Sequence, residues 1–176
     1  MTLAVNDWRE RVLATLPDEV RGRLEWVEAK MPRCESELER IFLILFAIVH
    51  RDFTNFTYAG EAPPDGELSG RRFLANFEQQ VKLAGYRCDF LLTITALSTG
   101  RVLRIAIECD GHSFHDRTPE QASRDRRRDR ALIAEGVPTL RYTYSDLARD
   151  PSGSIMDFAR TFKAIVTNFC DREGGE

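Results

Sequence analysis

The sequence predicts an α/β domain whose elements follow the order helix, three strands, helix, strand, helix. A largely apolar helical stretch begins at Glu35, and three runs rich in β-branched and aromatic residues follow between 77 and 110. A further strand-like run, 137–144, lies between two helical patterns. With 176 residues, of which 43% are hydrophobic and 30% charged, the chain has the composition of a soluble globular protein with a real core.

The first part of the chain is predicted to be helical. Residues 6–30 indicate two short helices separated at Pro17, with Asp18 as N-cap of the second. The stretch ESELERIFLILFAIVHRDF, from Glu35, has an acidic first turn, which suits the positive end of a helix dipole. Its apolar second half predicts burial. Residues 54–72 contain Pro-Pro-Asp-Gly and predict a long loop.

The second part alternates strands and helices. The predicted strands are 77–83, 86–97, 101–110 and 137–144, and the predicted helices are 119–135 and 154–170. Thr118 and Pro119 have the pattern of a helix N-cap followed by proline at the first helical position, with Gln121 completing a capping box. Gly136 and Pro138 end that helix.

A cluster of titratable groups follows the third strand, in the stretch IAIECDGHSFHD (105–116). Because strand side chains alternate between faces, Glu108 and Asp110 share one face. If the turn at 98–100 closes a hairpin with an even number of loop residues, Asp89 lies on that same face, and Cys88 lies beside Cys109 in the core. An odd loop would separate Asp89 from Glu108.

Carboxylates that converge on one patch repel one another unless they share a cation, a proton or an arginine. A hard ion such as Mg²⁺ binds a few carboxylate oxygens and keeps positions for water and substrate phosphate. Such an ion polarises a phosphodiester and activates an attacking water. The alternative is an acidic strand end that pairs with nearby arginines.

The two histidines and the arginine-rich helix carry further alternatives. His112 and His115 have the spacing of a zinc-binding pair. Alternatively, either histidine acts as a general acid or base beside a metal-bound phosphodiester, or both are surface loop residues. The run RDRRRDR (124–130) is either a solvated face with Asp–Arg pairs or a source of phosphate contacts. For phosphate, the candidates are Arg124 and Arg128, one turn apart, and Arg127.

Composition excludes several classes of protein. The net charge of −3 excludes nucleic-acid binding by overall charge, so a local basic face would be needed. The four cysteines form no CxxC pair, which argues against a disulfide framework or a zinc ribbon. The N-terminus has no signal-peptide core, and the longest apolar run, 41–49, is too short to span a bilayer. We therefore expect a soluble cytoplasmic protein.

Over residues 34–145 the sequence resembles the PD-(D/E)xK nuclease superfamily, in the branch of the very short patch repair endonucleases and their single-domain relatives. The similar segments are ESELER, FEQQVKLAGYRCDFLL, IAIECDGHSFHD, the arginine-rich helix and LRYTYSDL. The resemblance implies a restriction-endonuclease-like αβββαβ core with a mixed four-stranded sheet, flanked by N-terminal helices and a C-terminal helix.

The resemblance also implies roles for individual residues. Asp89 and Glu108 match the metal-binding acidic residues, and the backbone carbonyl of Cys109 matches a further ligand. Asp110 and His115 stand where the repair endonucleases carry histidines. Glu37 resembles an acidic residue that the first helix sends toward the site, and Gln80 matches a glutamine that often precedes the motif aspartate.

One departure from the family pattern is at Asp110, where members usually carry lysine. Asp110 binding a second metal ion, or His112, His115 or Arg124 replacing the lysine, would preserve activity, whereas an inactive site is the other alternative. The zinc-binding cysteine set of the repair endonucleases is absent from the sequence, so mismatch repair is not implied.

Together these arguments predict a helical N-terminal extension over 1–33 and a nuclease domain over 34–176. The expected activity is hydrolysis of DNA phosphodiesters with Mg²⁺ or Mn²⁺, with RNA as an alternative substrate. The rival function is a catalytically degenerate module that binds nucleic acid or a protein partner. Whether residues 1–33 form a homodimer, shield DNA or complete the core stays open.

Overall fold

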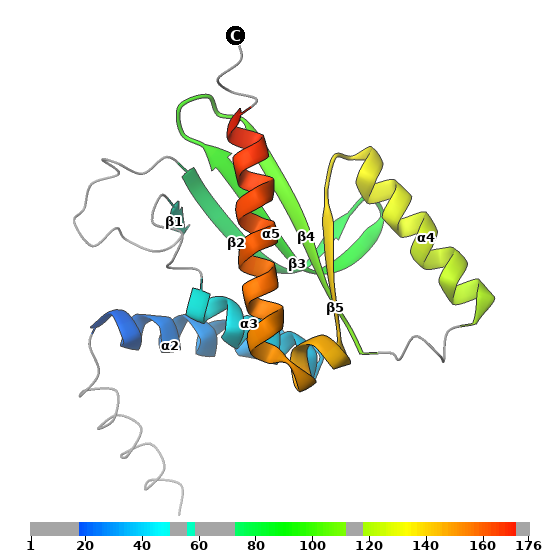
Figure 1. The fold of residues 1–176 in the computed structure, drawn as a ribbon, viewed down its shortest axis with the longest axis horizontal. Coiled ribbons are helices and arrows are strands. Elements are labelled where there is room, and N and C mark those ends of the chain that lie inside the picture. The colour runs from blue at the N-terminus through cyan, green and yellow to red at the C-terminus, as the bar shows by residue number, and fades with distance from the viewer. Residues whose placement is uncertain (1–17, 50–55, 59–72, 112–117, 172–176) are drawn as a thin grey trace, which may run out of the picture.

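The computed structural model describes residues 18–49, 56–58, 73–111 and 118–171, which form an α/β fold (Figure 1). N-terminal helices, a mixed sheet and a C-terminal helix follow one another along the chain. The elements are α2 (Asp18–Lys30), the 3₁₀ turn Met31–Arg33, α3 (Glu37–Val49), β1 (Phe56–Tyr58), β2 (Phe73–Leu83), β3 (Tyr86–Ala96), β4 (Val102–Asp110), α4 (Pro119–Ala134), β5 (Thr139–Thr143), the π-helical turn Ser145–Arg149 and α5 (Pro151–Asp171).

Within the described residues, five strands form one sheet in the order β1-β2-β3-β4-β5. β2, β3 and β4 are antiparallel neighbours, whereas β5 runs parallel to β4 after the α4 crossover. The four predicted strands are therefore present, and β2 begins at Phe73, earlier than predicted. The predicted loop over 54–72 is wrong at 56–58, because β1 pairs there in parallel with β2. Its three strand-forming residues are too few to show an alternating pattern.

The β3–β4 hairpin has the even loop on which the site prediction depended. The amide of Ala96 donates to the carbonyl of Arg101 at 2.9 Å, which leaves 97–100 as the loop. The paired positions run from Thr95 with Val102 to Phe90 with Ile107. The even parity of the hairpin loop is confirmed, and the regular pairing ends one residue before Asp89 and Glu108.

The prediction that Cys88 lies beside Cys109 in the core is wrong. Cys88 belongs to a small cluster with Ala106 and Leu132, whereas Cys109 packs against the larger core on the other face. The alternation of side chains between the two faces of the sheet breaks at this end of β3. Beyond Phe90, β3 no longer pairs with β4, and Gln80 of the neighbouring strand β2 has a left-handed backbone, with φ of 55°.

Helices cover both faces of the sheet. Figure 1 shows α5 crossing the sheet on the side where α2 and α3 also lie, with α4 beyond β5. The large core on the α3–α5 side is aromatic, and Phe42 is central to it: its ring lies 5.4 Å from Phe90 and 5.5 Å from Phe158 between centroids. The cluster under α4 consists of Cys88, Ala106, Leu132 and Val137.

The described part of the N-terminal segment completes the large core. Trp26 of α2 lies 6.0 Å from Phe46 and 5.5 Å from Phe77 between ring centroids. Lys30 Nζ donates a hydrogen bond to the backbone carbonyl of Phe77 at 3.1 Å. The most apolar helix, α3, is buried along one side, and none of the described helices is long and apolar enough to span a membrane.

Candidate functional site

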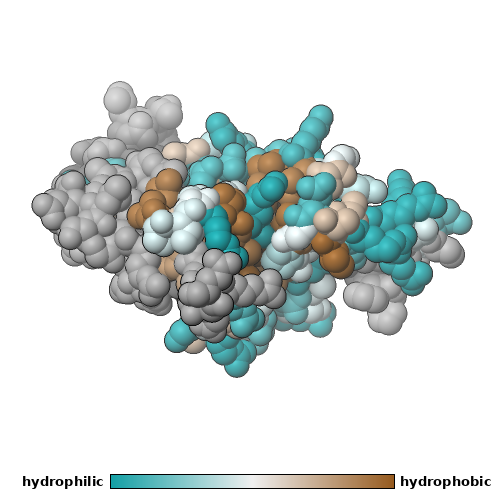
Figure 2. All heavy atoms as spheres, turned by 90° about the horizontal axis from the view of Figure 1, so that it is seen from above, coloured by the Kyte–Doolittle hydropathy of each residue, from teal (hydrophilic) through white to brown (hydrophobic). Residues whose placement is uncertain are grey.

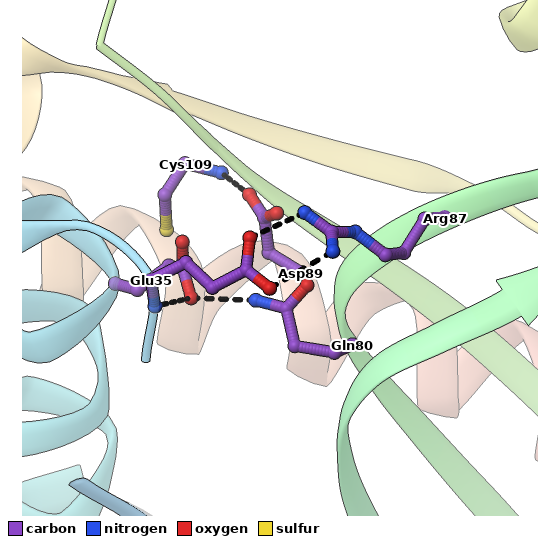
Figure 3. Close-up of polar contacts among 6 residues, drawn as sticks. Glu35, Gln80, Arg87, Asp89 and Cys109 are labelled. Carbon is purple, nitrogen blue, oxygen red and sulfur yellow. Dashed lines mark hydrogen bonds and ion pairs between the residues drawn. The ribbon is translucent and has the colours of Figure 1, made fainter. Parts of the chain in front are cut away.

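The candidate site lies where β3 and β4 separate. Their pairing ends at Phe90 with Ile107, one residue before Asp89 and Glu108. The Asp89 carboxylate enters this opening and accepts the backbone N–H of Cys109 at 2.7 Å (Figure 3). A side chain thus replaces the strand pairing, which fixes one carboxylate oxygen at the end of β4.

Asp89 is half-buried, and its surroundings favour the protonated form. Burial raises its pKa above the ordinary value, and the negative charge of Glu39 adds to the rise. The Cys109 amide and the positive charges of Arg128 and Arg87 act in the opposite direction. The net rise indicates that opposite charges do not fully compensate this carboxylate, so a bound cation would be stabilised there.

The acidic residue that α3 brings to this cluster is Glu39. Its side chain is 4% exposed and accepts a hydrogen bond from Gln80 Nε2 at 2.7 Å. Glu37, which the resemblance placed here, is exposed. Helical spacing explains the difference, because Glu39 precedes the buried Phe42 and Leu43 by three and four residues, whereas Glu37 does not share their face.

Two hydrogen bonds at the start of α3 hold Glu39 in place. Its backbone amide donates to Ser36 Oγ at 3.2 Å, and its carboxylate accepts the Glu35 amide at 3.0 Å. This is a variant of the capping box, and the Ser-x-x-Glu pattern was the signal in the sequence that could have identified Glu39. Glu35 itself makes an exposed ion pair with Arg87 of β3, drawn in Figure 3.

Glu108 is the most deeply buried of the predicted acidic ligands, with 5% exposure. Its Oε2 pairs with Arg128 Nη1 at 3.1 Å. Burial raises the pKa of Glu108 to about 7 and Asp89 adds to the rise, whereas Arg128, Arg141 and a hydrogen bond from Cys88 lower it. Burial therefore outweighs the ion pair, and Glu108 titrates near neutral pH.

The ion pair follows from how α4 lies against β4. Leu132 of α4 packs in the same small cluster as Ala106 of β4. Arg128 lies one helical turn before Leu132, about 6 Å away along the helix axis. Glu108 lies two residues after Ala106, about 7 Å farther along the strand. The inward face of α4 thus changes from apolar to basic where β4 changes from apolar to acidic.

The remaining predicted site residues lie around this centre or outside the described part of the chain. Asp110 is half-buried at the last residue of β4, in register with Thr143 of β5. Arg124 and Arg127 are exposed on α4. His112 and His115 lie outside the described residues, so the structure does not place the proposed proton carriers.

The charged side chains of α4 interact both within the helix, as Glu120 does with Arg124, and with other elements. Asp129 pairs with Arg141 of β5, not with a helix neighbour. Arg124 attracts Glu120 one turn earlier on α4, but neither Arg124 nor Arg127 is held in an ion pair with a described carboxylate. Their guanidinium groups are therefore available to an anion from outside.

The carboxylates fit a divalent ion in part. Glu108 Oε1 is buried and has no hydrogen-bond partner among the described residues, and Asp89 contributes a second carboxylate with a raised pKa. Two carboxylates suffice for Mg²⁺, which completes its octahedron with water and phosphate. Among the described residues, no three His, Cys, Asp or Glu side chains gather closely enough to hold a metal by themselves.

Comparisons of the chain with protein-family models, with curated proteins and with solved structures found no match.

Proposed function

We propose that this protein is a metal-dependent endonuclease with a restriction-endonuclease-like fold that hydrolyses phosphodiester bonds in DNA. The observation that carries the proposal is the placement of Asp89 and Glu108 where β3 and β4 separate. Both carboxylates have raised pKa values, and the basic side of α4 lies next to them. Acidic ligands beside phosphate-binding arginines are the arrangement that metal-assisted phosphodiester hydrolysis needs.

Each residue has a role in this proposal. Asp89, Glu108 and the backbone carbonyl of Cys109 would hold Mg²⁺ or Mn²⁺, with Asp110 assisting. When bound, the ion would polarise the scissile phosphate and lower the pKa of an attacking water. Glu39 takes the supporting position that Glu37 was expected to fill, because its buried carboxylate orients Gln80 beside Asp89.

In this proposal the nucleic acid binds along α4. With an overall charge of −3, attraction must come from a local basic surface, and the exposed Arg124 and Arg127 would provide one. Binding of this kind depends on release of counterions and weakens steeply with salt.

A second candidate function is a catalytically degenerate module that binds nucleic acid or a protein partner. The observation that favours it is the ion pair between Arg128 and Glu108, in which a guanidinium already neutralises the carboxylate. Asp110 also stands where the resembling family carries lysine.

Metal-dependent nicking of supercoiled plasmid separates the two functions. We expect nicking in Mg²⁺ or Mn²⁺ that is lost in Asp89→Asn and Glu108→Gln. Glu78→Gln, at an exposed position of β2, is the matched control and should nick like the wild type. A wild type that binds DNA but nicks in neither metal would support the binding module, and the same assay with an RNA substrate tests the alternative substrate.

A further inference from the structure

A groove opens between the start of β3 and α4, with a volume of about 480 Å³. Its lining consists of Tyr86, Arg124, Asp125, Arg127 and Arg128. Figure 2 shows hydrophilic side chains covering the end of the molecule where α4 lies. The volume falls in the range of small-molecule sites, about 300–1,000 Å³, so the groove can hold a group the size of a nucleotide.

The charges of the groove favour an anion. Arg124, Arg127 and Arg128 line the groove, whereas its described lining contains a single carboxylate, that of Asp125. Arg124 and Arg127 are exposed, and Arg124 also attracts Glu120 one turn earlier on α4. Guanidinium groups bind phosphate through paired N–H donors. The phosphate of a ligand would therefore lie between Arg124 and Arg127.

Arg128 connects the groove with the candidate catalytic site. It lines the groove and, through Nη1, pairs with Glu108 at 3.1 Å. Its side chain is 21% exposed, so it reaches the buried carboxylate from the groove wall. A phosphate in the groove would consequently lie next to the phosphodiester proposed for cleavage.

Tyr86 distinguishes this groove from a simple phosphate site. Among the described lining residues it is the one aromatic side chain, and it is half-buried at the first residue of β3. Grooves that bind single strands combine positive charge along the backbone with aromatic side chains on which bases stack. Bases inside a duplex are already stacked on each other, so an aromatic wall serves an unpaired base.

We propose that this groove is a subsite for an unpaired nucleotide of a nucleic-acid strand, with its base against Tyr86 and its phosphate on Arg124 and Arg127. The inference rests on the proposed nucleic-acid function but not on catalysis. It names the substrate class as single-stranded nucleic acid, or a strand with an unpaired residue next to the cleaved bond.

The test is fluorescence anisotropy in EDTA, where no cleavage occurs, with a labelled 12-nucleotide oligothymidine and a duplex of the same length. We expect tighter binding of the single strand and an affinity loss of about tenfold in Tyr86→Leu, the size of one lost stacking contact. Tyr86→Phe should bind like the wild type. Arg124→Ala and Arg127→Ala should each lower the salt dependence by about 0.7 in the logarithmic slope.

The helix offers a matched control for the arginines. Arg126 and Arg130 are exposed on α4 but do not line the groove, so Arg126→Ala and Arg130→Ala should weaken binding less than either groove variant. Unchanged binding by Tyr86→Leu, or tighter binding of the duplex, would overturn the inference even if plasmid nicking is observed. Tyr86-dependent binding without nicking in any metal would support the subsite and remove the proposed nuclease activity.

Discussion

One face of the sheet buries an aromatic cluster under α3 and α5, whereas the face under α4 buries a small cluster followed by an ion pair. On the first face Phe42, Phe158 and Phe162 are at most 1% exposed. On the second, Leu132 is the largest member of the cluster, and Glu108 and Arg128 meet one turn farther along. The contrast teaches that the packed aromatic rings and the Glu108–Arg128 ion pair are placed on opposite sides of β4.

The difference has a physical consequence for the charged groups. A carboxylate such as Glu108 would not be accommodated among tightly packed rings, because an unpaired buried charge costs several kcal/mol. Beside α4 it finds Arg128 and Arg141, and burial still raises its pKa to about 7. On the other side of the sheet, the buried Glu39 of α3 accepts hydrogen bonds from Gln80 and from the Glu35 amide and has no ion-pair partner among the described residues.

The largest expected effect is a truncation in the aromatic face. Phe158→Ala should lower the free energy of unfolding by about 4 kcal/mol, because a ring of this size leaves a large cavity. Leu132→Ala, in the smaller cluster, should cost about 2 kcal/mol. Urea denaturation measures both, and Ile133→Ala, at a side chain that is 71% exposed, is the control. Equal costs at Phe158 and Leu132 would contradict the difference between the faces.

The second prediction concerns the ion pair on the α4 face. Arg128→Ala at pH 8 should lower the free energy of unfolding by about 3 kcal/mol, since it leaves the Glu108 carboxylate buried without its partner. The exposed pair of Arg87 with Glu35 provides the comparison, and Arg87→Ala should change stability little. Chemical denaturation of both variants decides the question. Similar losses in the two would show that Glu108 is no more dependent on its partner than a surface carboxylate.

The third prediction is the pH dependence of stability that Glu108 causes. Its pKa is about 7 in the folded protein against 4.5 for an ordinary glutamate, so the folded state binds its proton more tightly. This contribution is present in full below pH 4.5 and is lost as the pH rises to 7, a change of up to about 3 kcal/mol. Glu108→Gln should flatten the decline between pH 4.5 and 7 in urea titrations. A decline that persists in the variant would assign the effect to another group, with Asp89 the first candidate because its pKa is also raised.

The same titration acts in the opposite direction on metal binding. A metal ion needs the ionised carboxylate, so proposed nicking activity should rise as the pH increases through 7 while stability declines. Plasmid nicking at pH 6 and pH 8, in constant salt and metal, tests this relation. Activity that falls over this interval would argue against Glu108 as a ligand.

Local patterns predicted the elements and the pairing of the strands. The β-branched runs predicted the four main strands, and the even loop after Ala96 set the β3–β4 register as far as Phe90 and Ile107. Helical spacing could also have chosen Glu39 over Glu37, because Glu39 lies on the side of Phe42 and Leu43. These features depend on the spacing of side chains that share a face, which is two residues in strands and three to four residues in helices. Such spacings can be read from a single sequence.

Other features depend on how elements lie against one another, which no local period specifies. The pairing of Arg128 with Glu108, and of Asp129 with Arg141, follows from the position of α4 along β4 and β5. Cys88 lies on the opposite face of the sheet from the one predicted, because the pairing of β3 with β4 ends at Phe90. Asp129 has helix arginines near it in the sequence, yet its partner in the structure is Arg141 of β5.

The smallest expected effect is a gain in stability at the β2–β3 turn, on the α4 face. Leu83 pairs with Tyr86, and the two residues between them, Ala84 and Gly85, both have positive φ, of 51° and 79°. This is the type I′ hairpin turn, in which Asn-Gly is favoured. Ala84→Asn should therefore raise the free energy of unfolding by about 0.5–1 kcal/mol, because asparagine tolerates the left-handed backbone better than alanine.

A β-branched residue at the same position provides the control of opposite sign. Ala84→Val should lower the free energy of unfolding, since its side chain clashes in the left-handed region. The turn lies against the smaller cluster, on the other side of the sheet from Phe158. The effects of Ala84→Asn and Phe158→Ala should therefore add within about 0.5 kcal/mol in the double variant. A larger deviation would mean that the two faces are energetically coupled through the sheet, so that their contributions to stability would not be independent.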